Sequence, residues 1–230
     1  MARQFRKRPR KTKAKKRTDQ IMRYASTGMK VANAAYTGLS LASKLAAIVN
    51  AEKKFYDLSA SNTVVNTGSV YLLNGVPQGN AEQQRVGDGL KMHSLNINYT
   101  IAKSVNEAAS VIRVIVFMWK DPNTAVTPNQ ILDLLNVRSF KSWHDKNRSK
   151  ILYDRLITLN DAGGGQSEGN TASYRVNIPF KDALAKFSHV RFSAGAATIE
   201  SNGLYILEIS DQATNLPTLS RVSRVYYYDN

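Results

Sequence analysis

Residues 111–119 read Val-Ile-Arg-Val-Ile-Val-Phe-Met-Trp, an almost unbroken run of apolar and mostly β-branched or aromatic side chains. A run of this length and composition is typical of a β-strand that is covered on both of its faces. The segment Leu95–Ile101 has a different pattern, because its apolar residues alternate with Asn96, Asn98 and Thr100. Alternation with a period of two predicts a strand with one buried face. Together the two patterns indicate an all-β domain.

Further strand candidates surround these two, and turn-forming residues separate them. The candidates are Lys53–Leu58, Ser69–Leu73, Ile151–Leu159, Ser173–Phe180, His189–Ser193, Gly203–Ser210 and Arg221–Tyr228. One short helix is expected at Pro128–Asn136, because Thr127 can cap it and proline is favoured in the first helical turn. About eight strands, loops of varied length and one helical insertion predict a single β-sandwich domain, and an eight-stranded jelly roll is a strong candidate.

The composition and the motifs argue against enzymatic activity. The 230 residues include no cysteine, which excludes disulfides and thiolate metal sites. The only three histidines, His93, His144 and His189, are far apart in the sequence, and no nucleophile or phosphate-binding motif is present. Acidic residues are scattered singly, so no dense calcium loop is predicted. We therefore expect a non-enzymatic protein without a cofactor or a metal site.

Most of the excess positive charge lies at the N-terminus. The net charge is +15, yet residues 31–230 carry 20 bases and 16 acids, whereas residues 1–17 carry ten bases and no acid. Such a segment is expected to be a disordered arm when free, and to bind a polyanion by releasing condensed counterions. A nuclear-localisation signal or a solubilising tail is the alternative. The predicted nucleic-acid-binding residues are Arg3, Arg6, Lys7, Arg8, Arg10, Lys11, Lys13, Lys15, Lys16 and Arg17, with Arg23 just beyond the arm.

The next segment, residues 18–50, has apolar residues at a rough helical spacing after a cap at Thr18 or Asp19. The apolar stripe consists largely of small residues, so the helix needs a partner surface, either on other copies or on the body of the chain. A membrane-surface helix is a weaker alternative, because few large apolar residues are present. The sequence thus predicts three parts: a basic arm at 1–17, a helical segment at 18–50 and a shell-type domain at 51–230.

Two aromatic features remain open at this stage. Phe140 and Trp143 stand within a second basic cluster that consists of Arg138, Lys141, Lys146, Arg148 and Lys150. Such a cluster can stack on single-stranded nucleic acid. Alternatively, and with more weight, it is a solvated loop whose aromatics fill the sandwich or contact another subunit. The consecutive tyrosines Tyr226–Tyr228 place rings on both faces of a terminal strand, which suits burial in an interface.

Three segments carry a resemblance to a known family: Glu52–Asp57, Leu73–Gly79 and Gln84–Asp88. They resemble the coat protein of satellite tobacco necrosis virus and the related capsid proteins of small circular single-stranded DNA viruses. The resemblance covers roughly residues 50–230 in order. Its most specific part is the spacing Asn-Gly-x-x-Gln-Gly followed by Gln-Arg-x-Gly-Asp.

The resemblance implies a virion protein whose 60 equivalent copies form a small icosahedral T=1 shell. It also implies that the arm points inward and binds a single-stranded genome, and that the following helix lies near the threefold axes. We favour DNA over RNA, which would place assembly in the host nucleus and make nuclear import factors partners. Calcium binds at subunit contacts in the satellite virus, but Asn80 stands here at one of its acidic positions. Glu52 and Asp229 lie near the other acidic positions and are not assigned as ligands.

Charge counting is consistent with packaging. Sixty N-terminal segments of about +11 each supply about 660 positive charges, enough to neutralise much of a genome on the order of a thousand nucleotides. The alternative is a non-viral nucleic-acid-binding β-sandwich protein with a basic tail. Such a protein is expected to carry bases across its folded face as well, and the nearly balanced charge of residues 31–230 argues against it.

Overall fold

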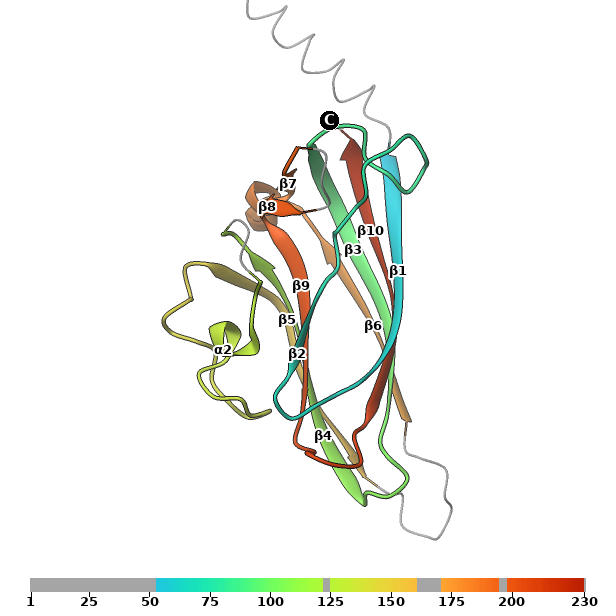
Figure 1. Cartoon of the computed structure of the whole chain (residues 1–230), viewed down its shortest axis with the longest axis vertical. Helices are drawn as coiled ribbons and strands as arrows, with labels where there is room; N and C mark the ends of the chain where they lie inside the picture. Colours follow the sequence, from blue (N-terminus) through green and yellow to red (C-terminus); the bar gives the residue numbers. More distant parts are fainter. Residues whose placement is uncertain (1–52, 122–124, 161–170, 195–197, 230) are drawn as a thin grey trace, which may run out of the picture. The chain divides into compact units, whose positions relative to one another are not determined.

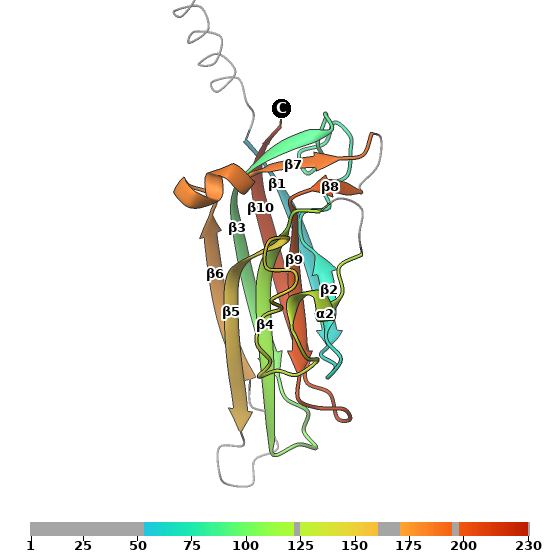
Figure 2. The same cartoon turned by 90° about the vertical axis from the view of Figure 1, so that its left-hand side faces the viewer.

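The computed structural model describes residues 53–121, 125–160, 171–194 and 198–229, which fold into ten strands, one short helix and one 3-10 helix (Figures 1 and 2). The elements are β1 (Lys53–Thr63), β2 (Ser69–Leu72), β3 (Gly89–Ala102), β4 (Ala109–Trp119), α2 (Pro128–Ile131), β5 (Ser149–Asn160), β6 (Thr171–Pro179), η1 (Asp182–Phe187), β7 (His189–Phe192), β8 (Ile199–Ser201), β9 (Gly203–Ser210) and β10 (Thr218–Asp229). The predicted arm and the predicted helix at 18–50 lie outside the described residues. The three-part division of the chain therefore stays a prediction.

Eight of these strands form two antiparallel sheets of four. One sheet has the order β1-β10-β3-β6, and the other has the order β2-β9-β4-β5. The pairs β1–β10, β2–β9, β3–β6 and β4–β5 are nested, as in one long antiparallel hairpin folded across two layers. This nesting is the jelly-roll arrangement, so the predicted eight-stranded jelly roll is confirmed. The short strands β7 and β8 extend the first sheet, because β7 pairs with Gly89–Lys91 of β3.

Strand β4 contributes to two separate apolar clusters, as its continuous apolar sequence predicts. Val114, Val116 and Met118 face the layer between the two sheets. Ile115 and Phe117, on the opposite face of β4, join a second cluster that lies outside the sandwich. That second cluster is closed by residues of the β4–β5 connection, which lies beside the β2-β9-β4-β5 sheet in Figure 1.

The helix in that connection is shorter than predicted. Pro128 does begin it, and the Gln130 side chain accepts a hydrogen bond of 2.9 Å from the backbone N–H of Thr127. The helix ends at Ile131, however, and not at Asn136. Leu132 is already extended because it pairs with Lys141 across a β-bridge. The hairpin pairing supplies the backbone hydrogen bonds that further helical turns were expected to make.

Two elements were not predicted from the sequence, and several strands are longer than predicted, β3 and β1 most of all, because β3 begins at Gly89 and not at Leu95. The 3-10 helix η1 and the three-residue strand β8 have no clear periodic pattern. Strand β1 runs to Thr63, beyond the predicted end at Leu58, because its polar second half pairs with Thr218–Val222 of β10. The predicted turn between β8 and β9 is confirmed by a positive φ of 58° at Asn202.

Candidate assembly surface

The described residues contain no site with the appearance of an active centre. No group of three or more His, Asp or Glu residues that could hold a metal ion occurs among them. His93 packs edge-on against the ring of Tyr228 at 5.8 Å, where burial, aided by the charge of Lys53, lowers its pKa. His189 lies on β7 and His144 in the β4–β5 connection, so the three histidines do not converge. Within the described part of the chain, no helix is long and apolar enough to cross a membrane.

The predicted nucleic-acid-binding residues lie outside the described residues. This applies to all ten bases from Arg3 to Arg17 and to Arg23. Their role stays a prediction that rests on the sequence.

The segment 73–88, which carries the most specific motif, is a self-closed loop at one end of the sandwich. Its two halves are joined by hydrogen bonds from Gly79 N–H to Arg85 C=O at 2.9 Å and from Arg85 N–H to Pro77 C=O at 3.0 Å. The buried Asn74 accepts a bond of 2.9 Å from the backbone N–H of Leu204, which ties the loop to β9. A side chain at Gly79 would displace the end of the Gln84 side chain, whose Oε1 atom stands where the added Cβ would lie.

Arg85 is the central residue of this loop and is completely buried. Its guanidinium donates to the carbonyl oxygens of Val76 and Gly87 and lies 4.1 Å from the centre of the Phe192 ring. The charge is compensated in part by Asp88, whose Oδ1 lies 3.4 Å from Nη1. The spacing of the motif thus has a structural explanation: a buried arginine satisfies the carbonyls of a loop that has no strand partner.

The chain end closes the same end of the sandwich. Asp229 pairs with Lys54 at 3.1 Å, and its Oδ2 also accepts a bond of 2.8 Å from the backbone N–H of Val86. These contacts connect β1, β10 and the 73–88 loop. Next to them, Tyr227 is buried in the core while Tyr226 and Tyr228 are only half-buried on the outer face. The expectation of rings on both faces of this strand is confirmed.

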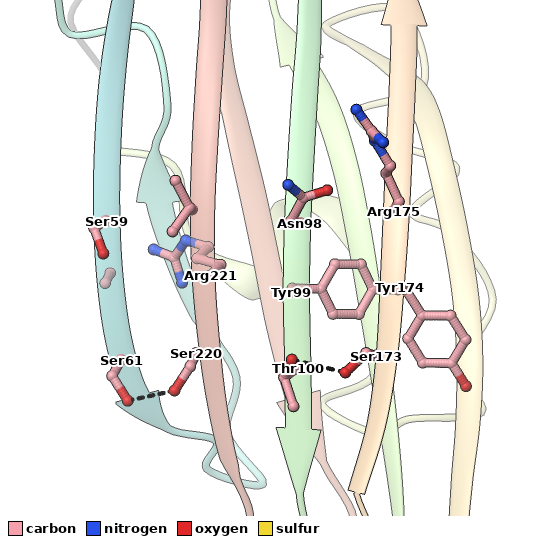
Figure 3. Close-up of a pocket in the computed structure, with 12 residues that line it drawn as sticks. Ser59, Ser61, Asn98, Tyr99, Thr100, Ser173, Tyr174, Arg175, Ser220 and Arg221 are labelled. Carbon is pink, nitrogen blue, oxygen red and sulfur yellow. Dashed lines mark hydrogen bonds between the residues drawn. The ribbon is translucent and has the colours of Figure 1, made fainter.

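The outer face of the β1-β10-β3-β6 sheet is polar and open. A hollow of about 760 Å³ lies on this face. Figure 3 shows its lining residues, among which exposed hydroxyl groups pair across neighbouring strands. Ser61 pairs with Ser220 at 2.8 Å, and Thr100 pairs with Ser173 at 2.9 Å. Asn98 and Arg175 stand beside them. The hollow has two arginines, Arg175 and Arg221, and no carboxylate in its lining, and nothing in it provides acid–base chemistry.

One ion pair stands on this polar face. Arg224 donates two hydrogen bonds of 2.6 Å each to the two carboxylate oxygens of Asp57 on the neighbouring strand. These bonds hold the pKa of Asp57 below its ordinary value. The guanidinium also lies 4.4 Å from the centre of the Phe55 ring.

A second ion pair lies in the interior, between the two sheets. Glu208 of β9 and Arg221 of β10 are each about 1% exposed and form a hydrogen-bonded pair. The guanidinium lies 4.6 Å from the centre of the Tyr71 ring. Burial outweighs the attraction of Arg221 and raises the pKa of Glu208 to about 7.

The β4–β5 connection packs against the outer face of the β2-β9-β4-β5 sheet, and we call its described residues, 120–121 and 125–148, the insertion. Its buried residues Ile131, Leu132 and Val137 belong to the second apolar cluster, with Phe117, Leu207 and other residues of β4 and β9. Its backbone is held by the Arg113 guanidinium, which donates to the carbonyl oxygens of Val137 and Ser139 at 3.2 and 2.5 Å.

The same guanidinium is locked in place by Asp154 of β5. Two hydrogen bonds of 2.8 and 2.9 Å join Arg113 to the carboxylate, and Lys141 lies 3.3 Å from it. Burial by itself raises the pKa of Asp154, but the two cations hold it below its ordinary value. The carboxylate is therefore ionised at neutral pH, and it fixes one side of the insertion to β5.

The upper side of the insertion exposes large apolar groups. Phe140 is 85% exposed, Trp143 71% and Leu134 69%. Leu135, also on the insertion, is exposed as well, and so is Leu156 on the adjacent strand β5. The interpretation that the two aromatics fill the sandwich is wrong, because the leucine, isoleucine and valine residues of the second cluster already occupy that position.

A jelly roll that presents a firmly anchored apolar surface is typical of a structural protein that works through contacts. The sequence model of the family described as "Satellite tobacco necrosis virus coat protein" matches residues 35–230. The chain belongs to this family. It is a viral coat protein, a non-enzymatic component of a virion, and its copies associate into a small icosahedral capsid.

Solved structures with similar folds include other plant-virus coat proteins at low identity. A chain from the structure of the empty head of turnip yellow mosaic virus has 12% sequence identity to this chain. The match has a TM-score of 0.38 and covers 78% of this chain and 82% of that chain. Desmodium yellow mottle tymovirus is 9% identical, with a TM-score of 0.34 over 78% and 88%. Latent PorU from Porphyromonas gingivalis is 6% identical, with a TM-score of 0.36, and this chain spans 13% of its length. These scores are too low to carry an argument, and no curated protein matches the chain.

Proposed function

We propose that 60 copies of this coat protein close into a T=1 shell and that the arm at residues 1–17 packages a single-stranded genome inside it. One observation carries the proposal: the arm holds ten bases and no acid, whereas residues 31–230 hold 20 bases against 16 acids. The cationic charge is thus concentrated where it can reach a polyanion. The nearly balanced remainder can pack edge to edge without strong repulsion.

The proposed mechanism is charge neutralisation coupled to assembly. Each base that contacts a phosphate releases a condensed counterion, so the arm gains affinity without reading the base sequence. Many arms acting on one polymer bind far more tightly than one arm, and each subunit contact can then be weak. The residues that contact phosphate in this mechanism are the bases from Arg3 to Arg17, assisted by Arg23.

The chemistry of the genome is a separate part of the proposal. An arm that contacts phosphates does not distinguish DNA from RNA, because it does not require the 2′-OH. The preference for DNA that the resemblance suggested gains no support from the family match, and assembly in the host nucleus depends on it. Nucleic acid extracted from particles, digested separately with DNase and RNase, decides between the two.

The packaging mechanism is tested by two arm variants with the same length. In the first, all ten Lys and Arg residues of 1–17 are replaced by Gln. In the second, the order of residues 1–17 is scrambled and the composition is kept. Electron microscopy and the ratio of absorbance at 260 and 280 nm are recorded for both. We expect filled particles for the scrambled arm, and empty or absent particles for the neutral arm.

Either opposite result overturns the mechanism. Nucleic acid inside particles of the neutral arm would mean that another surface packages the genome. Loss of packaging by the scrambled arm would mean that the arm reads or adopts a specific structure. Subunits that never form closed particles, at any salt concentration or with any arm, would contradict the T=1 shell itself.

A further inference from the structure

The large apolar side chains that the described residues expose are concentrated in one place. Eight such side chains are exposed, and five of them stand on the insertion or on the adjacent part of β5. We call these five the insertion patch: Leu134, Leu135, Phe140, Trp143 and Leu156. The other three, Val86, Val105 and Val222, are single valines on three different elements. Scattered exposed valines are ordinary, whereas a gathered patch with two aromatic rings marks a contact surface.

The patch is held in place by its own backbone. The N–H of Asp133 donates to the carbonyl oxygen of Phe140 at 3.0 Å, and the Asp133 side chain accepts a bond of 3.3 Å from the N–H of Trp143. The N–H of Leu134 donates to the Ser139 hydroxyl at 2.8 Å. Three patch residues are therefore presented by one tight hairpin. A surface that is ordered before binding loses little conformational entropy when it is covered.

The hairpin patch is continuous with the sheet beside it. Phe140 and Leu156 line a single hollow of about 780 Å³, together with Lys141 and Asp154. Arg113 and Asp154 line the same hollow, and their ion pair therefore holds together the insertion, which carries Phe140, and strand β5, which carries Leu156. The apolar surface thus extends from the insertion onto β5.

The chemistry of this patch favours a protein surface over nucleic acid as its occupant. The patch contains three leucines, which offer no stacking plane to a base. Two of the neighbouring bases pair with acids of the same chain: Lys141 lies 3.3 Å from Asp154, and Arg148 pairs with Asp121 and Asp145 at 2.6 and 3.2 Å. Lys146 lies over the Trp143 ring at 3.2 Å from its centre. Cations that are already paired contribute little to phosphate binding by counterion release.

We propose that the insertion patch binds the insertion patch of a second copy of this chain across a twofold axis. An apolar surface needs an apolar cover, and among the described residues the patch itself is the one gathered apolar surface. A symmetric contact in which a surface meets itself satisfies this need without any further complementary site. The inference rests on the proposed closed shell, because every icosahedral shell contains twofold axes.

The size of the contact fits this role. Two covered aromatic rings bury on the order of 300–400 Å² on each copy, a large part of the roughly 800 Å² per partner that a specific interface covers. Two of the bases at the rim, Lys141 and Arg148, pair with acids of their own chain, which reduces the repulsion between two facing patches.

The absence of cysteine from the chain allows a direct test by cross-linking. Full-length single-cysteine variants Leu134→Cys, Phe140→Cys and Trp143→Cys are assembled, oxidised and separated on a non-reducing gel. Residues near a twofold axis meet their own copies, so we expect at least one variant to form covalent dimers and no larger species. Val105→Cys, with a similarly exposed position on another loop, is the control and is expected to give at least tenfold less dimer.

Two further results would overturn the inference. Monomers from all three patch variants in particles of normal appearance would place the patch away from the twofold axis. Cross-linking only in a double variant that pairs Phe140→Cys with Ala32→Cys would mean that residues 18–50 of another copy cover the patch. Both results leave the closed shell intact, so they are distinguishable from a failure of the proposed function.

A second measurement does not require two cysteines to lie close together at the twofold axis. The double variant Phe140→Glu/Trp143→Glu is expected to fold with an unchanged β-type circular dichroism spectrum and to form at least tenfold fewer particles than Val105→Glu. Normal particles that have lost their nucleic acid would instead show that the aromatics stack on the genome, and would overturn the inference.

Discussion

The outer faces of the two sheets differ in a way that their common architecture does not require. The outer face of β1-β10-β3-β6 carries paired hydroxyl groups, such as Ser61 with Ser220, and is open to solvent. The outer face of β2-β9-β4-β5 carries Ile115, Phe117 and Leu207, and the insertion covers it. The difference originates in the side-chain pattern: strands that alternate have one apolar face, whereas β4 has two.

This difference divides the molecule by task. The polar sheet needs no further layer, so its outer face adds little to the stability of the domain. The apolar sheet requires a cover, and the insertion that supplies the cover presents the insertion patch on its own upper side. A second hydrophobic layer thus becomes a rigid platform for contacts between copies, and three substitutions test the difference between the layers.

The largest effect is expected in the second apolar cluster. Phe117 is completely buried and stacks on Tyr205 with ring centres 5.6 Å apart. Phe117→Ala is expected to lower the free energy of unfolding by about 3–5 kcal/mol, because it removes a buried ring and leaves a cavity. Ser220→Ala on the polar face is the matched control and is expected to change it by less than about 0.5 kcal/mol. Urea unfolding of full-length unassembled subunits measures both, and equal effects would contradict the division between the faces.

An intermediate effect is expected in the layer that the two sheets share. The pKa of Glu208 is raised to about 7, so between its ordinary value and pH 7 the folded chain binds more protons than the unfolded chain. Stability is therefore expected to fall as the pH rises through this window, by about 1–3 kcal/mol. Glu208→Gln should match the native chain near pH 4.5 and exceed it at pH 8. A variant that is less stable at every pH would show that Glu208 is ionised throughout.

The smallest effect is expected at the ion pair on the polar face. Asp57 is partly exposed, and its bonds to Arg224 hold its pKa below the ordinary value. The pair therefore stabilises the fold above the ordinary pKa of an aspartate and loses this contribution as the pH falls below it, opposite in sign to Glu208. Asp57→Asn is expected to cost under about 1 kcal/mol at pH 7, as other exposed pairs do. A loss several times larger, measured by urea unfolding, would mean that this face is covered in the subunit.

The sequence predicted the elements whose pattern is repeated along several residues. The strand at 111–119 and its two buried faces, the alternating strand at 95–101 and the turn at Asn202 were all found as expected. The predicted lengths and ends of the strands and of the helix were less accurate, because they depend on the segments with which each element pairs. Strand β1 continues through polar residues that only its pairing with β10 makes regular, and α2 ends early where Leu132 meets Lys141.

The candidate site was less accessible to sequence analysis. The cluster of Phe140 and Trp143 with nearby bases was recognised from the sequence. Whether the two aromatic side chains face the sandwich or the solvent was not, because their exposure depends on which residues already fill the second apolar cluster. The anchoring residues Arg113 and Asp154 are 41 positions apart and gave no signal of a common role. Arg85 was part of the motif, yet nothing in its neighbours indicated that this arginine would be completely buried.

By itself, the sequence determined the strand pattern, the sandwich class and the concentration of positive charge in residues 1–17, because periodicity and charge are local properties of the chain. The tertiary structure alone decided that Glu208 meets Arg221 across two sheets and that the insertion turns its aromatic rings outward. Both outcomes depend on which distant residues compete for the same buried space. That competition is settled only when the two layers pack, since an interior is filled to a fixed density and every side chain that does not fit must face outward.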